Sequence, residues 1–283
     1  MKTQKYSWKT YLFSSFFILG IVCSTESLTA TTEEENTERK KVEMVTTHGS
    51  LVMEFYNETP LHRDNFLKLV KEGAYDGLLF HRVIDNFVIQ AGDPDSKEAK
   101  ADAALGNGDV GYTVDAEFRS DIFHKRGTIG AARDGNPERA SSGIQFYVVQ
   151  RGVQSDSLLE VAEKRINTML ARHFAYKDPA YSELIASMEK AQEAENMKKY
   201  RKFNDQLDTI AKTYTSYEKY TIPEAHRAVY KTQGGIPHLD QNYTIFGEVV
   251  QGMDVVDTIA KVKTNDRDRP VDDVRIISAR IID

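Results

Sequence analysis

Short runs in which apolar and polar residues alternate recur along most of the chain after residue 41. The run over 42–56 alternates on both sides of His48-Gly49-Ser50, which predicts a hairpin of two strands joined by a glycine turn. Thr59-Pro60 then predicts the start of a helix with a hydroxyl cap, and Gly73 predicts its end. Further short apolar runs predict strands at 79–84, 87–90, 127–132, 144–150, 245–250 and 274–282, and a helix at 252–262.

This succession of short strands with two helices is typical of a closed antiparallel β-barrel capped by helices. The expected fold class is therefore mainly β with capping helices (α+β). The segment 151–235 interrupts the pattern, because between Gln154 and Lys231 it contains no glycine and almost no strand signal. We expect it to be an inserted α-helical segment that divides the barrel chain in two.

Apolar residues of the segment 151–235 return at the spacing of helix turns, which predicts two or three amphipathic helices. The three stripes consist of Leu159, Ala162, Ile166 and Met169, then Tyr181, Leu184, Met188 and Ala191, then Phe203, Leu207, Ile210 and Tyr214. Two interpretations remain open at this point. The stripes either pack the helices against one another or form a surface that holds another protein.

The N-terminus carries a pattern of its own. Three lysines precede an apolar stretch from Tyr11 to Cys23, which is too short for an ordinary membrane-spanning helix and predicts a signal peptide over 1–30. A buried core helix is the competing interpretation. Residues 31–41 are polar and acidic and predict a flexible tether. Because Cys23 stands where a lipoprotein carries its lipidated cysteine, the exported chain is either soluble in a periplasm or anchored to a membrane as a lipoprotein.

Composition narrows the classes of function. The 283 residues are 40% hydrophobic and 28% charged, a balance typical of globular domains. With a formal net charge of −6 the chain lacks the excess positive charge that usually attracts nucleic acid, so no nucleic-acid partner is expected. No run of 18 apolar residues occurs, which excludes a protein with several membrane spans.

Metal sites find little support in the sequence. A single cysteine excludes an intramolecular disulfide framework and a four-cysteine zinc site. The seven histidines show no paired spacing of metal ligands. Residues 265–273 (NDRDRPVDD) lack the glycine and the final glutamate of a calcium loop and predict a solvated turn. We therefore expect no bound metal.

A more specific signal lies in residues 75–94, which read YDGLLFHRVIDNFVIQAGDP. Phe80-His81-Arg82, Phe87, Gln90 and Gly92-Asp93-Pro94 match, in order and spacing, the cyclophilin family of peptidyl-prolyl cis–trans isomerases. Further stretches resemble the family in register, namely GNGDVGYTVDAEF (106–118), His124, Gly127, SSGIQFYVV (141–149) and PHLDQNYTIFGEVVQGMDVVDTI (237–259). The resemblance covers 42–150 and 236–283 and implies one cyclophilin-like isomerase domain, split by the helical insertion 151–235.

The chemistry of prolyl isomerisation requires few groups. Amide resonance gives a rotation barrier of roughly 18–20 kcal/mol, so an isomerase must favour the twisted amide over both planar forms. In the twisted state the prolyl nitrogen gains a basic lone pair, which a fixed cationic donor stabilises. No nucleophile, metal or redox group is needed, and we expect no cofactor.

The resemblance implies a role for each site residue. Arg82 would be the cationic donor, and Gln90 would hold the substrate backbone and orient Arg82. The expected substrate-binding residues are Phe87, Val88, Ala132, Arg133, Gln145, Tyr147, His238, Leu239 and Tyr243. Structural alternatives remain open, namely a surface ion pair for Arg82, a structural hydrogen bond for Gln90 and strand packing for Phe87.

Within this set, Phe87 and Val88 would form one wall of an apolar proline pocket, Tyr147 its floor and Leu239 its far side. Ala132 and Arg133 would lie on the strand that pairs with the extended peptide, and Gln145 would border the pocket.

Besides Ala131-Ala132-Arg133, which stands in place of Met-Ala-Asn, three positions depart from the family pattern. Tyr147 adds a hydroxyl where phenylalanine is usual, His238 replaces a tryptophan of the drug-sensitive eukaryotic members, and Tyr243 replaces their histidine. A buried hydroxyl without a partner costs about 1–3 kcal/mol. The hydroxyl of Tyr147 should therefore find a partner or narrow the pocket.

The sequence thus leads us to expect an exported isomerase that acts on proline-containing unfolded or extended polypeptides. A proline-peptide binding module or holdase chaperone with incidental isomerase activity is the alternative, and a structural surface lipoprotein is a third. The insertion suggests the binding-module or holdase alternative, because in the sequence it begins just after Tyr147 and ends just before Leu239. It would emerge beside the predicted pocket, where it could hold a client or another partner protein.

Overall fold

The structure, a computed structural model, describes residues 38–282. The predicted signal peptide 1–30, Cys23 and residues 31–37 of the predicted tether lie outside the described residues. Within the described range the chain forms ten strands, six α-helices and three short 3₁₀-helices. No helix in this range is long and apolar enough to cross a membrane.

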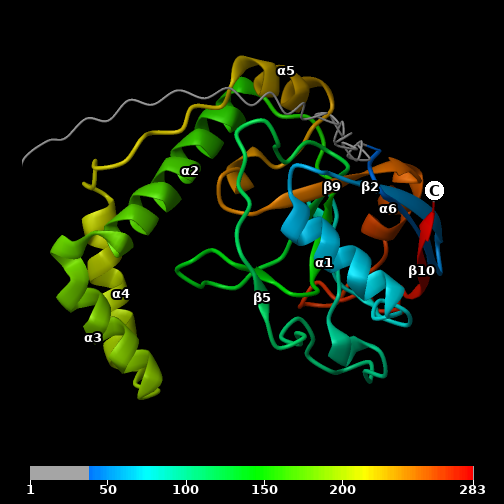
Figure 1. The fold of residues 1–283 in the computed structure, drawn as a ribbon, viewed down its shortest axis with the longest axis horizontal. Coiled ribbons are helices and arrows are strands. Elements are labelled where there is room, and N and C mark those ends of the chain that lie inside the picture. The colour runs from blue at the N-terminus through cyan, green and yellow to red at the C-terminus, as the bar shows by residue number, and fades with distance from the viewer. Residues whose placement is uncertain (1–37, 283) are drawn as a thin grey trace, which may run out of the picture. The chain divides into compact units, whose positions relative to one another are not determined.

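Eight strands form one antiparallel sheet in the order β10-β1-β2-β9-β6-β8-β4-β3, and β5 pairs with β7 apart from it (Figure 1). The strands are β1 (Lys41–Thr46), β2 (Gly49–Phe55), β3 (Phe80–Ile84), β4 (Val88–Ala91), β5 (Thr113–Val114), β6 (Thr128–Ala131), β7 (Ser141–Ser142), β8 (Phe146–Val149), β9 (Ile245–Gln251) and β10 (Ile276–Ile282). The hairpin and the six further strands are confirmed to within two residues at each end. The sequence did not predict β5 and β7, because two residues are too few to show a period.

The predicted closed barrel is not what the structure shows. The sheet curls until its edge strands β3 and β10 approach each other, but no ladder joins them. One isolated bridge, Leu79 to Arg275, and single backbone bonds such as Phe80 N–H to Val274 O (2.9 Å) span the gap. The ladder is missing because β3 meets mainly the residues that precede β10, while β10 itself pairs with β1.

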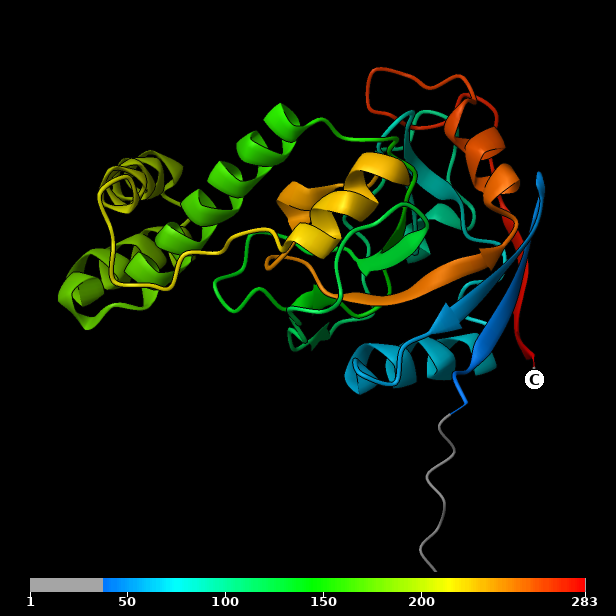
Figure 2. The same ribbon diagram turned by 90° about the horizontal axis from the view of Figure 1, so that it is seen from above.

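The helices fall into two groups, α1 and α6 beside the sheet and α2 to α5 in the insertion (Figure 2). They are α1 (Pro60–Lys71), α2 (Asp156–Lys177), α3 (Ser182–Glu193), α4 (Met197–Ala211), α5 (Glu224–Thr232) and α6 (Met253–Ala260), and the 3₁₀-helices are η1 (Pro94–Ser96), η2 (Pro179–Tyr181) and η3 (Pro237–Leu239). The predicted helix at 252–262 is confirmed as α6.

The start of α1 differs from the prediction. Thr59 stands at the N-cap, but its hydroxyl makes no hydrogen bond and is buried without a partner. The carboxylate of Glu117 accepts the N–H groups of Leu61 and His62 instead, both at 3.0 Å. A negative charge at this position also complements the helix dipole, so a distant residue replaces the local cap.

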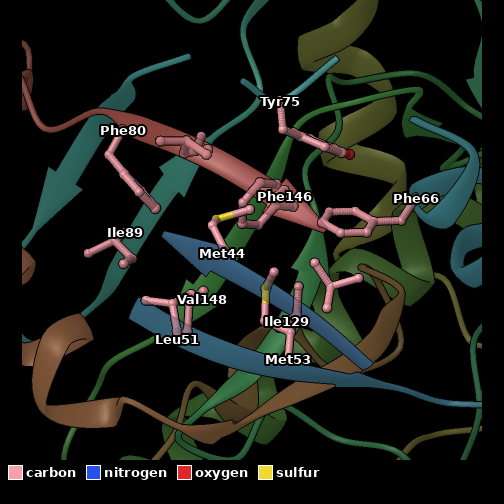
Figure 3. Packing of buried hydrophobic residues seen from close by; sticks show 14 of the residues in the cluster. Met44, Leu51, Met53, Phe66, Tyr75, Phe80, Ile89, Ile129, Phe146 and Val148 are labelled. Carbon is pink, nitrogen blue, oxygen red and sulfur yellow. The ribbon is translucent and has the colours of Figure 1, made fainter. Parts of the chain in front are cut away.

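One continuous apolar core lies under the curled sheet (Figure 3). Phe66 of α1 reaches it and places its ring 4.6 Å from that of Tyr75 and 5.5 Å from that of Phe146. Met44 and Met53 of the first hairpin meet the same cluster and are fully buried. Burying one such side chain stabilises the fold by roughly 1.5–3 kcal/mol, so this core is what holds the pocket strands in place.

The insertion contains four helices, where the sequence predicted two or three. Glu195 adopts a left-handed backbone (φ 51°) and ends α3, and the side chain of Asn196 then caps α4 at the N–H of Lys199. The stripe residues Leu159, Ala162 and Ile166 are buried together with Tyr230 of α5. A second cluster joins α2, α3 and α4. The stripes therefore pack the helices against one another.

The two ends of the insertion touch. A Cβ added to Gly234 would lie only 2.4 Å from the carbonyl oxygen of Arg151 and from the carbonyl carbon of Gly152. The departing and the returning chain are thus in direct backbone contact, and Gly234 is required because any side chain would separate them. The insertion therefore lies within the single connection between β8 and β9.

Candidate active site

Nine of the eleven predicted site residues line one pocket of about 210 Å³. The pocket is formed by Arg82, Phe87, Val88, Gln90, Ala132, Arg133, Tyr147, Leu239 and Tyr243. The other two predicted residues, Gln145 and His238, contact members of this set. Strands β3, β4 and β8, the residues after β6, the 3₁₀-helix η3 and the loop before β9 therefore bring together residues that stand up to 161 positions apart in the chain.

A chain of polar contacts holds Arg82. Arg82 and Gln90 are direct cross-strand partners on β3 and β4. The Arg82 guanidinium donates to Gln90 Oε1 at 3.3 Å, Gln90 Nε2 donates to Gln145 Oε1 at 3.1 Å, and Gln145 Nε2 donates to the backbone carbonyls of Gly106 and Gly108. Because each amide is fixed at both ends, the guanidinium is held in a defined position beside the pocket.

A carboxylate faces the other side of the same guanidinium. Asp268 Oδ2 lies 3.7 Å from Arg82 Nε, and both side chains are partly exposed. Asp268 belongs to the 265–273 stretch, for which the sequence predicted a solvated turn. This prediction is wrong for Arg269, which is 4% exposed and donates to the carbonyls of Lys100 and Ala103. The turn is anchored by that buried arginine and so can present Asp268 at a fixed place.

The walls of the pocket are aromatic and partly cationic. Phe87 stacks on His238, with ring centroids 6.2 Å apart and planes at 5°. The Arg133 guanidinium lies 4.7 Å from the centroid of the Tyr243 ring, a cation–π distance. Val88 is buried behind the wall. Burial, together with nearby Arg165 of α2, lowers the pKa of His238 to about 4, so this ring is neutral at pH 7.

Tyr147 forms the floor, and its hydroxyl has found a partner. His124 Nε2 lies 2.8 Å from the hydroxyl oxygen, and His124 Nδ1 lies 2.8 Å from Asp240 Oδ1. A carboxylate can only accept, so Nδ1 carries a proton; when Nε2 is unprotonated it accepts, and Tyr147 donates. Burial raises the pKa of Tyr147 well above its ordinary value, which keeps the donor proton in place.

The network ends on the insertion. Tyr230 of α5 donates its hydroxyl to Asp240 Oδ2 at 2.7 Å, and all four side chains are buried. None of His124, Tyr230 and Asp240 was predicted to be a site residue, although His124 and Asp240 lie within the motifs quoted above. No local pattern could have revealed the network, since its members stand at 124, 147, 230 and 240 and meet only in the folded chain.

A glycine makes room for this floor. A Cβ on Gly130, which pairs with Tyr147 across β6 and β8, would lie 2.2 Å from Cζ of the tyrosine ring. The ring therefore lies flat against the backbone of β6.

No cluster of three or more histidine, cysteine, aspartate or glutamate side chains that could hold a metal occurs within residues 38–282.

Comparison with known proteins gives a consistent picture. The family of cyclophilin type peptidyl-prolyl cis-trans isomerases matches residues 41–215 and 226–281. A Staphylococcus haemolyticus protein named as a peptidyl-prolyl cis-trans isomerase is 29% identical over 244 residues, which cover 86% of this chain and 91% of the relative. A Staphylococcus saprophyticus protein of the same name is 26% identical over 251 residues and is covered to 95%.

Two further similarities are more distant or partial. A Streptococcus pyogenes protein named as a bifunctional phosphatase/peptidyl-prolyl cis-trans isomerase is 28% identical over 253 residues, and this chain spans only 40% of its length. Among solved structures, the cyclophilin type isomerase cgd2_1660 of Cryptosporidium parvum shares 18% identity with a TM-score of 0.49, over 87% of this chain and 98% of that one. Because the family match extends over most of the sequence, this chain belongs to the cyclophilin-type peptidyl-prolyl cis–trans isomerase family.

Proposed function

We propose that this chain accelerates rotation about X–Pro bonds in unfolded or extended polypeptides outside the cytoplasm. The observation that carries the proposal is the fixed guanidinium of Arg82 beside an apolar pocket that is large enough for a proline ring. The pocket walls come from Phe87, Val88 and Leu239, and its floor comes from Tyr147.

The mechanism assigns the rate acceleration to selective binding of the twisted amide. The apolar pocket holds the proline ring, and the Arg82 guanidinium donates to the prolyl nitrogen once twisting has made it basic. Gln90 and Asp268 hold the guanidinium in place, so it does not move to interact equally well with the planar cis and trans forms of the amide. Lowering the barrier by about 6–7 kcal/mol would correspond to roughly 10⁵-fold acceleration, which a charged donor and correct orientation can supply together.

The backbone N–H and carbonyl of Arg133 are the groups that would pair with the substrate backbone. The N–H of Ala132 donates to the carbonyl of Gln145 (2.9 Å), and the carbonyl of Ala132 accepts the N–H of Ser142 (2.8 Å). Only the methyl group of Ala132 therefore faces the pocket. Within residues 38–282 the N–H and carbonyl of Arg133 make no backbone–backbone hydrogen bond. We therefore place the extended peptide beside Arg133, with Ala132 as part of the pocket wall.

Export is part of the proposal and depends on the predicted signal peptide 1–30. Slow X–Pro exchange limits the folding of many proteins, so an exported isomerase has a use in a compartment where chains arrive unfolded. The intact mass of the exported protein distinguishes a lipid on Cys23, which would tether the enzyme to a membrane, from a cleaved soluble chain.

Exchange between the cis and trans forms of a proline tetrapeptide, measured by NMR line exchange, tests the proposal. The full chain should accelerate exchange, and Arg82→Ala should lower kcat/KM by about 100-fold or more, the cost of losing one charged transition-state donor. Arg119→Ala is the matched control, because Arg119 is equally exposed and pairs with one carboxylate, Asp121. A chain that is folded by circular dichroism and yet leaves exchange unchanged would contradict the proposal.

The insertion supports a second candidate function, a client-holding chaperone whose isomerase activity is incidental. Its ends touch at Gly152 and Gly234, so residues 153–233 can be excised and the ends joined. Because the excision also removes Tyr230, the reference is the full chain carrying Tyr230→Phe. If the shortened chain isomerises a tetrapeptide within about threefold of this reference and refolds a protein substrate at least tenfold more slowly, the insertion is a client arm. Equal performance on both substrates would count against a holdase.

A further inference from the structure

A second cleft, of about 500 Å³, lies between the insertion and the loop that follows Arg133. Residues 133–137, Arg139 and Asn242 line it on the sheet side, and side chains of α2, α3 and α4 line it on the other. Arg133 lines both this cleft and the proline pocket. The two sites therefore adjoin, and an extended chain, which advances about 3.3–3.6 Å per residue, passes from one to the other within a few residues.

Two guanidiniums in this cleft lack a carboxylate partner. Arg133 donates to the backbone oxygen and the side-chain oxygen of Asn242, at 2.9 and 2.8 Å. Arg139 donates one N–H to the carbonyl of Gln241 at 2.8 Å, and its Nε is buried without any partner. Neither arginine forms a salt bridge within the described part of the chain.

The remaining charges of the cleft are already engaged. Arg172 pairs with Asp208 at 2.7 Å. Asp134 is exposed and accepts from the side chain of Asn136 at 2.9 Å, and Glu189 accepts the hydroxyl of Tyr176. Glu138, next to Arg139 in the chain, pairs with Lys177. The cleft thus holds two guanidiniums that have no carboxylate within salt-bridge distance.

The electrostatics of neighbouring groups agree with this geometry. Burial and the nearby charge of Arg133 lower the pKa of Arg139 to about 10. Burial, with Arg139 and Lys177 close by, lowers the pKa of His173 to about 4, so this ring adds no charge at pH 7. Two methionines, Met169 and Met188, supply apolar and adaptable lining.

We propose that this cleft binds an acidic side chain of the client polypeptide, a few residues from the proline, and that Arg139 is the residue that selects it. The proposal rests on the isomerase function proposed above. Nη2 of Arg139 makes no hydrogen bond within residues 38–282, and a planar guanidinium suits a carboxylate, which can accept two parallel hydrogen bonds. The partial exclusion of water strengthens that contact relative to a surface ion pair.

Matched peptides test the inference with the full chain. Each peptide carries the same Ala-Pro core and a glutamate, glutamine or lysine placed two, three or four residues from the proline, on either side. At one position at least, kcat/KM for the glutamate peptide should exceed that for the glutamine peptide by about tenfold, the effect of one charge-assisted hydrogen bond. The lysine peptide should be slower than both, and the preference should shrink in 0.5 M salt.

Two variants locate the effect. Arg139→Gln should reduce the ratio of glutamate to glutamine activity to about one, whereas Arg172→Gln, in the same cleft but already paired with Asp208, should keep it. The ratio is internal to each variant, so a change in the amount of folded protein cancels. Equal rates for all three peptides in an active wild-type enzyme would overturn the acidic-client inference and leave the isomerase proposal standing. A folded wild type that isomerises none of them would defeat the isomerase proposal itself.

Discussion

The curled sheet and the helical insertion are held together in different ways. Under the sheet lies one continuous core, in which Phe55, Phe146 and Ile89 are each at most 1% exposed. The insertion has two small clusters instead, one where α2 meets α5 and one among α2, α3 and α4. Its outer faces carry exposed ion pairs, such as Lys231 with Asp156, which contribute at most about 1 kcal/mol each.

The difference separates two kinds of task. The sheet core fixes the pocket strands, so substitutions there should change stability and activity together. The insertion docks through few buried groups, of which the Tyr230 hydroxyl reaches the network under the pocket floor. Substitutions elsewhere in the insertion should mainly affect which client is chosen. Each of the following variants tests that separation, and they are ordered by the size of the expected effect.

The largest effect is expected at Gly130 in the sheet. In Gly130→Ala the new Cβ would lie 2.2 Å from the Tyr147 ring and displace it from the floor, at a cost of about 3 kcal/mol of unfolding free energy. Urea denaturation followed by circular dichroism measures this. Gly135→Ala is the control, because a Cβ at Gly135 meets nothing within 4 Å and stability should stay within about 0.5 kcal/mol. Equal stabilities for the two variants would mean that the floor is not packed as described.

A smaller effect is expected at the contact between insertion and floor. Tyr230→Phe removes the hydroxyl from buried Asp240 and should lower the unfolding free energy by about 2 kcal/mol, since a buried acceptor is left short of a donor. It should also raise KM for a tetrapeptide severalfold through the loosened His124 and Tyr147. Tyr220→Phe is the control, because the Tyr220 hydroxyl makes no hydrogen bond within residues 38–282. If both variants match the wild type, the insertion does not support the pocket.

The smallest effect is expected in acid. Burial lowers the pKa of His81 to about 4, and both ring nitrogens lack partners. Between pH 6.5 and 4 the unfolded chain binds the proton more readily, so stability is lost as the pH falls through this window. His81→Leu should reduce the loss of unfolding free energy between pH 7 and pH 5 by about 1–2 kcal/mol.

The same measurement on His173 compares the insertion with the sheet. The pKa of His173 is also lowered to about 4, but its ring lies in the solvent-accessible cleft, so water screens the effect. His173→Leu should therefore change the acid loss less than His81→Leu does. A larger change at His173 would reverse the distinction drawn between the two regions.

Much of the fold and of the pocket could be predicted from local patterns. Alternation located the hairpin at β1 and β2 and the central strands, because a half-buried strand must alternate. The Phe80 to Pro94 motif pointed to Arg82, Phe87 and Gln90, which the structure places together in one pocket. Their catalytic and binding roles remain predictions.

Other features depended on contacts that no local pattern contains. The cap of α1 comes from Glu117, more than fifty residues away, and the 265–273 turn is anchored by buried Arg269. The fourth helix of the insertion, α5, carries none of the three predicted stripes and buries only His226 and Tyr230. A hydropathy period reports how often apolar residues recur, and it carries no information about which distant group completes a hydrogen bond.

The sequence by itself determined the strand pattern and the helical nature of the insertion, which follow from the local period, and its resemblance to the cyclophilin family indicated nine of the residues that line the pocket. Only the tertiary structure decided three things: that the sheet curls without a closing ladder, that Tyr147 is tied through His124 and Asp240 to Tyr230 of the insertion, and that Arg133 and Arg139 share a cleft in which neither has a salt-bridge partner. The reason is physical. Edge pairing, buried hydrogen bonds and the net charge of a cleft are properties of groups that meet in space, and these groups are separated by many residues along the chain.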